Sequence, residues 1–119
     1  MREPIARVGG TAAGRSSASA WRDLAWAVAT AADKNAGVYE QTRSTLALID
    51  RHLAGCGTDK TRLLTATVYI ARMSDKPEMD RAWTEWIGAD PAHWPQRACV
   101  GTQLEGDTLV EVAVTAARG

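Results

Sequence analysis

Two residues near the C-terminus, Arg97 and Glu111, are the strongest candidates for a chemical role. Arg97 opens an expected strand just after Pro95, and a guanidinium can hold a carboxylate through two parallel hydrogen bonds. Glu111 stands between two valines in the last expected strand, where a carboxylate needs a partner or a chemical purpose. The pair therefore indicates either a carboxylate site or a structural ion pair, formed within one chain or between copies.

The other candidates for chemistry are weaker. His52 lies on an expected helix among polar residues, and His93 lies in a loop. Neither histidine has a cysteine at the spacing of a metal-ligand set, so we expect no metal site. The sequence also has no phosphate-binding glycine loop and no motif that pairs a serine nucleophile with a base. We therefore expect any activity to need no cofactor.

The periodicity of the first third of the chain predicts three strands. They are a short strand over residues 4–8 and, after a loop of small residues, a hairpin of strands 16–21 and 24–30. Residues 24–30 are rich in alanine, so their pattern alone leaves a helix open there.

Apolar residues at three- and four-residue steps predict a helix over residues 38–54, which Gly55-Cys56-Gly57 ends. A second helix is expected to begin at a cap formed by Ser74 or Asp75 and to end at Gly88. The expected buried stripe of the first helix is Val38, Thr42, Thr45, Leu46, Ile49 and Leu53, and that of the second is Met79, Trp83, Trp86 and Ile87.

Three further strands are expected over residues 62–72, 97–104 and 109–117. Because side chains alternate between the faces of a strand, one face of each should enter the core. The expected core residues are Leu64, Ala66, Val68 and Ile70 in the first, and Val110, Val112, Val114 and Ala116 in the last.

This order of elements predicts an α+β fold over residues 1–119 as a single domain, with two α-helices packed on one face of a mixed β-sheet. The opposite face would carry Tyr69, Glu111, Thr115 and similar residues. Such a half-apolar face is best covered by association with other copies of the chain.

Composition argues against some classes of binding partner. Lys plus Arg equals Asp plus Glu at 14 each, so the formal net charge is zero and there is no basic surface to attract nucleic acid. No apolar stretch is long enough to span a membrane, and no secretory signal follows Met1. Two cysteines, Cys56 and Cys99, are too few for a disulfide framework, which favours the cytoplasm.

Two spaced motifs resemble the reactive intermediate deaminase family, also called Rid or YjgF. Residues 95–100, Pro-Gln-Arg-Ala-Cys-Val, are similar to the Pro-x-Arg-Ser/Ala-Cys-Val signature of the family. Residues 110–112, Val-Glu-Val, are similar to its hydrophobic-Glu-hydrophobic final strand. The likeness covers residues 38–118 well and the N-terminal third in outline.

The resemblance implies a chorismate-mutase-like fold whose sheets pack into a trimeric barrel, with a ligand cleft between subunits. It gives Arg97 the task of anchoring a substrate carboxylate and Glu111 that of activating a water. Cys99 would line the same pocket.

Three positions depart from the deaminating members of the family. Ser17 stands where those members have a tyrosine, Ala31 stands where a glycine lines the pocket, with Thr30 before it, and Trp83 stands where an asparagine is frequent.

The leading hypothesis is hydrolysis of 2-imino or 2-enamino acids to 2-oxo acids and ammonia by a homotrimer. The alternative is a trimer that binds a small carboxylate or related metabolite without turnover, which the three departures favour. A third activity, ribonuclease, is attached to the family by name, and the zero net charge argues against it.

Overall fold

The computed structural model describes residues 2–119, which form a six-stranded sheet and two α-helices. The strand order is β1-β2-β3-β6-β4-β5, so that β6, the last strand of the chain, lies inside the sheet. β4 and β5 run parallel, and all other neighbours are antiparallel. The elements are β1 Ala6–Gly9, β2 Ser16–Trp21, β3 Leu24–Thr30, α1 Val38–Gly55, β4 Leu63–Ile70, α2 Lys76–Ile87, β5 Gln96–Gly101 and β6 Val110–Ala117.

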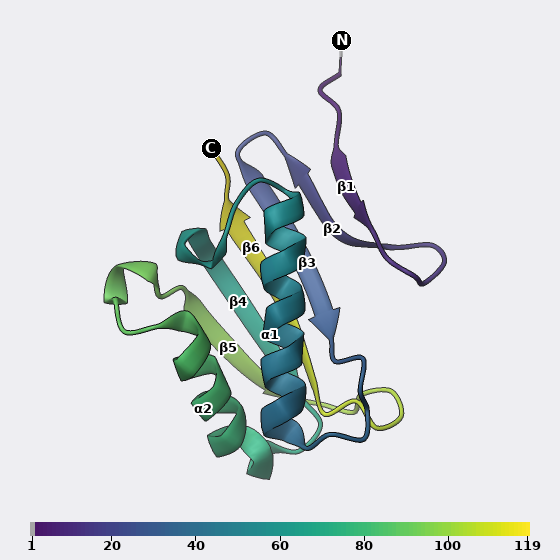
Figure 1. Cartoon of the computed structure of the whole chain (residues 1–119), viewed down its shortest axis with the longest axis vertical. Coiled ribbons are helices and arrows are strands. Elements are labelled where there is room, and N and C mark those ends of the chain that lie inside the picture. The colour runs from purple at the N-terminus through teal and green to yellow at the C-terminus, as the bar shows by residue number, and fades with distance from the viewer. Residues whose placement is uncertain (1) are drawn as a thin grey trace.

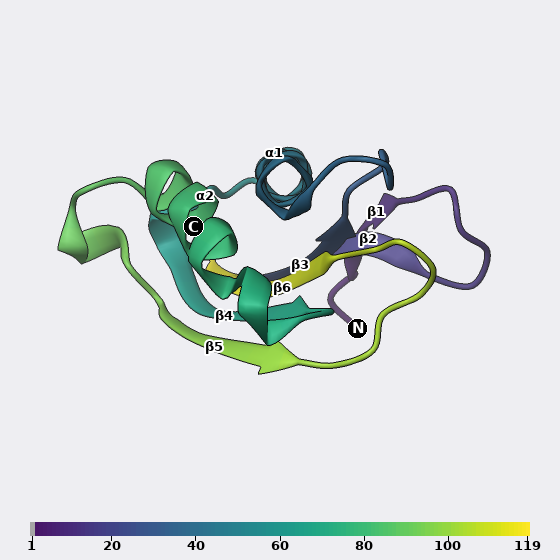
Figure 2. The same cartoon turned by 90° about the horizontal axis from the view of Figure 1, so that it is seen from below.

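Both helices lie on the same face of the sheet (Figures 1 and 2). α1 packs across β3 and β6, and α2 packs beside α1 over the end of the sheet that contains β5 (Figure 1). The expected α+β fold, with a mixed sheet and helices on one face, is confirmed. We call the uncovered side of the sheet the open face. Within residues 2–119, neither helix is long and apolar enough to cross a membrane.

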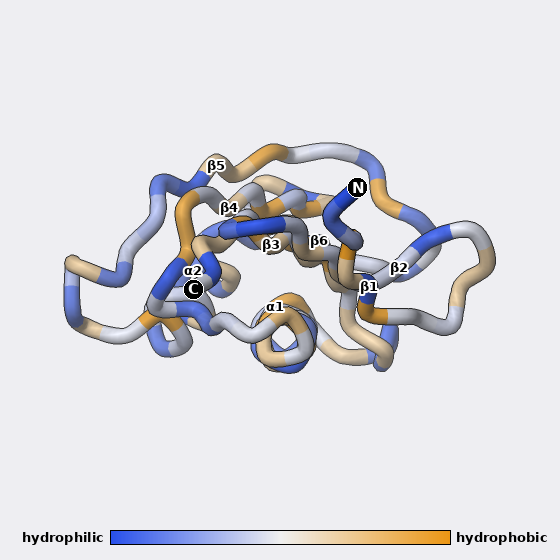
Figure 3. Tube along the Cα trace, turned by 90° about the horizontal axis from the view of Figure 1, so that it is seen from above, coloured by the Kyte–Doolittle hydropathy of each residue, from blue (hydrophilic) through white to orange (hydrophobic). Residues whose placement is uncertain are grey.

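The core lies between the helices and the sheet because side chains alternate along each strand. In β6, Val110, Val112, Val114 and Ala116 are buried, as the sequence predicted, and the intervening residues point to the open face. The apolar side of α1 meets this layer and its hydrophilic side faces away (Figure 3). Ile49 and Leu53 in α1, and Met79 in α2, are buried completely or almost so.

The structure confirms most of the elements that the sequence predicted. β2 and β3 form the expected hairpin around Arg22-Asp23, and residues 24–30 are strand rather than helix. The helices end at Gly55 and Ile87, within a residue of the predictions. β4 and β5 are shorter than predicted by several residues in total. Asp75 precedes α2 as expected, but its side chain makes no hydrogen bond to the helix and instead pairs with Arg72.

One prediction about the core is wrong. Leu64 was expected on the buried face of β4, but it is 44% exposed, and its neighbour Leu63 is buried instead. The cause is an irregularity in the pairing of β4 with β6 between Leu63 and Thr65. A β-bulge inserts one residue, so the alternation of faces changes phase at that point.

A buried glutamine in α1 connects three segments, a role that the residue pattern did not predict. Gln41 is fully buried, and its amide nitrogen donates to the carbonyl oxygens of Ala36 at 3.0 Å and Asp107 at 3.1 Å. Its amide oxygen accepts from the backbone N–H of Leu109 at 3.0 Å. The side chain thus holds the loop before α1 and the loop before β6 against the helix.

We expect Gln41→Leu to lower the free energy of unfolding by about 3 kcal/mol or more. The leucine fills a similar volume but leaves partly buried backbone groups without the partners that the amide supplied, at about 1–3 kcal/mol each. Urea denaturation measures the change, and Gln103→Leu, at an exposed position in the loop after β5, is the matched control. Equal stability of the two variants would show that the amide is not a structural link.

Candidate functional site

Arg97 lies near the start of the edge strand β5, and its side chain points to the helix-covered side of the sheet. Its register partner in β4 is Ala66, which is buried under the helices. Paired residues of parallel strands share a face, which explains why a charged side chain enters the space beside α2. The Arg97 side chain is 18% exposed, so it is largely buried while still reaching solvent.

Residues of α2 surround the guanidinium of Arg97. Nη2 donates to Oδ1 of Asp80 at 2.6 Å, and Nη1 lies 3.7 Å from Sδ of Met79. The guanidinium carbon lies 5.2 Å from the centre of the Trp83 ring, within the range of a cation–π interaction. The Arg97 side chain has several rotatable bonds, and these contacts hold it in one orientation.

Asp80 shares its carboxylate between two cations. Its Oδ2 accepts from Nζ of Lys76 at 2.8 Å, while Oδ1 accepts from Arg97. Burial alone would raise the pKa of Asp80, but the hydrogen bonds and charges of Lys76 and Arg97 outweigh that effect and hold the pKa below its ordinary value. Asp80 is therefore ionised at neutral pH.

Cys99 follows Arg97 by two residues and shares its face of β5. Its thiol is free, half-buried and packed against the core, beside its register partner Val68. Arg97 and Cys99 thus line the same side of the edge strand, as the alternation of the sequence predicted.

Glu111 lies on the open face, in β6, with Thr30 of β3 and Tyr69 of β4 as its register partners. It is therefore on the opposite side of the sheet from Arg97. Among residues 2–119, no cationic nitrogen lies within 4 Å of its carboxylate. The hypothesis that Arg97 and Glu111 pair with each other within one chain is wrong, because Arg97 pairs with Asp80.

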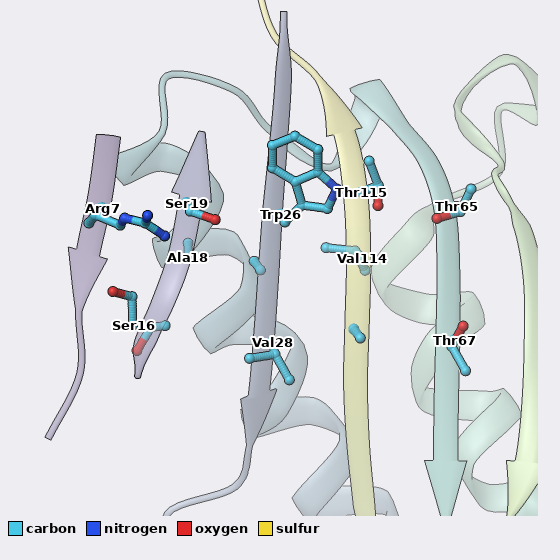
Figure 4. Close-up of a pocket in the computed structure, with 13 residues that line it drawn as sticks. Arg7, Ser16, Ala18, Ser19, Trp26, Val28, Thr65, Thr67, Val114 and Thr115 are labelled. Atoms are coloured by element: carbon cyan, nitrogen blue, oxygen red, sulfur yellow. The ribbon is translucent and has the colours of Figure 1, made fainter. Parts of the chain in front are cut away.

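The open face contains a depression of about 390 Å³ that runs across the sheet from β2 to β4. Ser17 contributes to it, together with Arg7, Ser19, Trp26, Thr65 and Thr67, and Figure 4 shows several of these side chains projecting from the face. Ser17 lies where the register between β1 and β2 shifts. Gly10 packs so closely that a Cβ there would lie 2.7 Å from Oγ of Ser17.

Thr30 and Ala31 end β3 close to Glu111. Thr30 is half-buried opposite Glu111, whereas Ala31 is 1% exposed. Because so little of Ala31 is exposed, its side chain offers almost no surface to a ligand in the single chain.

The sequence-predicted site residues thus fall into two groups in one chain. Arg97 and Cys99 lie on the helix side of β5, and Ser17, Thr30 and Glu111 lie on the open face. Asp80 and Lys76 were not among the site residues predicted from the sequence. The sequence signal that could have indicated them was an acid next to Met79 on the predicted helix, with a lysine one turn earlier. In the part of the chain that is described, no three His, Cys, Asp or Glu side chains gather as a metal site.

Comparison with known proteins places the chain in a family. The family model described as Endoribonuclease L-PSP matches residues 24–118. A RutC family protein from Haemophilus ducreyi is 44% identical over 86 residues, which cover 71% of this chain and 72% of that protein. The RutC family protein YoaB from Escherichia coli is 37% identical over 84 residues, covering 70% and 72% of the two chains.

Solved structures agree with this result over nearly the whole chain. A member of the YjgF protein family from Neisseria meningitidis superimposes with a TM-score of 0.87 at 34% identity, covering 98% of this chain and 96% of that one. The residues that the family model matches, 24–118, include Arg97, Cys99 and Glu111. The chain therefore belongs to the Rid/YjgF family, which the curated relatives represent under the name RutC.

Proposed function

We propose that this protein hydrolyses 2-imino or 2-enamino acids to 2-oxo acids and ammonia, without a cofactor, as a homotrimer in the cytoplasm. The observation that carries the proposal is the largely buried guanidinium of Arg97, which is fixed by α2 and keeps donors for a ligand. Family membership and the carboxylate of Glu111 on the open face support it. The two free cysteines fit a reducing compartment.

Arg97 would anchor the substrate by its carboxylate. Asp80 contacts the guanidinium through one oxygen only, so the fork of N–H donors is not filled by a bidentate partner. An anchored carboxylate places the adjacent imine carbon at a set position. This orientation turns an encounter with water into a reaction within one complex.

Glu111 would act as the base that activates a water. The water oxygen bonds to the carbon of the protonated imine while Glu111 takes one water proton, which gives a tetrahedral carbinolamine. The nitrogen then gains a proton and leaves as ammonia, while the hydroxyl loses a proton and the 2-oxo acid forms. A protonated imine is already electrophilic, so one base and one anchor suffice.

The two faces of the sheet support assembly from several copies. Within one chain, Arg97 and Glu111 lie on opposite sides of the sheet, so a site that uses both would need two copies. The open face also exposes Trp26 at 38%, Val28 at 39% and Val100 at 40%, an apolar surface that association would bury. Three copies that pack these faces together would form a closed cyclic assembly.

The alternative function is a trimer that binds a small carboxylate without turnover. A specific observation favours it: within one chain Arg97, held by Asp80, and Glu111 lie on opposite faces of the sheet, so the chain provides a carboxylate anchor without a base beside it. The replacements at Ser17, Ala31 and Trp83 point in the same direction. Both functions use Arg97, and only turnover separates them.

RNA cleavage, which the description of the family model names, has less support in this chain. Its net charge is zero, and the depression on the open face contains one basic residue, Arg7. Binding a polyanion draws on clustered lysine and arginine. A salt-dependent RNA titration would test this activity directly.

We expect light scattering at micromolar concentration to give about three times the chain mass of 12.8 kDa. Trp26→Glu should reduce the mass toward that of one chain, because it places a charge within the surface that assembly would bury. Ala47→Glu, on the exposed side of α1, adds the same charge on the opposite side of the molecule and should leave the trimer intact. A parent protein that stays monomeric would contradict the proposed interface.

We expect Arg97→Lys to weaken binding of 2-oxobutanoate by about tenfold or more. Lysine keeps the charge but loses the planar fork, and hydrogen bonds to charged groups contribute about 1.5–3 kcal/mol. Calorimetric titration measures the loss, with Arg51→Lys, at an exposed position in α1, as the matched control. Equal affinity in the two variants would mean that Arg97 acts only as a general charge.

We expect Glu111→Gln to lower single-turnover hydrolysis of a freshly generated imino acid by about a hundredfold, because the variant lacks the proton acceptor. Binding of 2-oxobutanoate and the melting temperature should persist, since no cation of the described residues pairs with Glu111. Glu105→Gln, in the exposed loop before β6, is the control. A lower melting temperature would instead identify Glu111 as half of an ion pair between copies.

A further inference from the structure

We propose that Asp80 is a positioning and specificity-determining residue, which makes the Arg97 site select ligands with one carboxylate over ligands with two. The inference rests on the proposed function only in taking Arg97 as the carboxylate anchor. It adds a preference between ligands with one and with two carboxylates, which Arg97 alone would not provide.

The geometry of the contact between Asp80 and Arg97 supports this role. The two oxygens of Asp80 are divided, one on Nη2 of Arg97 at 2.6 Å and one on Nζ of Lys76 at 2.8 Å. An aspartate that contacts an arginine end-on cannot fill its fork. Met79 and the Trp83 ring contact the same guanidinium. The side chain is thus held in one orientation while part of its donor set remains for a ligand.

The charge of the cluster formed by Arg97, Lys76 and Asp80 favours a ligand with one carboxylate. Arg97 and Lys76 contribute two positive charges, and Asp80 contributes one negative charge, which leaves one positive charge. A single ligand carboxylate neutralises that excess. A second ligand carboxylate has no cation left in the cluster and meets the negative charge of Asp80.

Distance supports the same selection. The two carboxylates of a five-carbon 2-oxo dicarboxylate are closer together than one Debye length, roughly 8 Å at physiological ionic strength, so anchoring one on Arg97 brings the other into the field of Asp80. Salt therefore screens the repulsion only in part. At the partly exposed positions of this cluster, one such repulsion corresponds to about a tenfold change in affinity.

The test compares two ligands of equal carbon number, 2-oxopentanoate with one carboxylate and 2-oxoglutarate with two. We expect calorimetry on the assembled parent protein to show tighter binding of 2-oxopentanoate. Asp80→Asn should shift the affinity ratio about tenfold toward 2-oxoglutarate. A general loss of Arg97 positioning affects both ligands alike and cancels in the ratio.

A second variant separates this effect from structural damage. Lys76→Gln removes a cation from the same cluster, so it should shift the ratio the other way, toward 2-oxopentanoate. Damage to the fold would not produce shifts of opposite sign. Glu78→Gln changes the net charge as Asp80→Asn does, but Glu78 is 54% exposed and pairs with Arg81, so the ratio should stay that of the parent.

Two outcomes would overturn the inference, and they are distinguishable. If the parent binds an oxo acid and Asp80→Asn leaves the ratio unchanged, Asp80 does not set selectivity, and the proposed function stands. If the parent binds neither acid while it is assembled and folded, the proposed carboxylate anchor fails and the selectivity fails with it.

Discussion

The alternation of side chains along β6 is the constraint on which the rest of the structure depends. β6 lies between β3 and β4 and pairs with both. Its valines face the helices, and Glu111, Ala113 and Thr115 face the other way. Both helices pack on the side of the sheet that carries the valines, because burial of their own apolar side chains is favourable there. One side of the sheet thus becomes a core, and the other remains exposed in the single chain.

This division also explains the arrangement of the candidate site. Arg97 and Glu111 cannot lie on one surface of a single sheet, because Arg97 points to the helix-covered face and Glu111 points to the open face. The contacts that Arg97 makes in its own chain come from α2, and they hold its guanidinium against that helix. What a second copy would add is the open face, with its hydroxyl-lined depression and the carboxylate of Glu111.

Much of the fold could be predicted from the sequence because local periodicity and burial agree along most of it. The hairpin around Arg22-Asp23, both helices and the buried side of β6 follow from residue pattern alone. Leu64 could not be placed, because a bulge depends on how two distant strands pair. Gln41 and Asp80 were missed for a related reason. A polar side chain in a helix looks solvated until its partners, from loops and strands far along the chain, are known. The motif around Arg97 was recognisable, whereas the surroundings of its guanidinium were not.

The position of β6 also bears on how the chain folds during synthesis. β6 is synthesised after the other five strands of the sheet, so β3 and β4 have no common neighbour until its residues have left the ribosome. Contacts between residues far apart in sequence form slowly, because the intervening chain must first be ordered. Nascent molecules will therefore expose unpaired edges of β3 and β4. Protection by chaperones matters most at this stage.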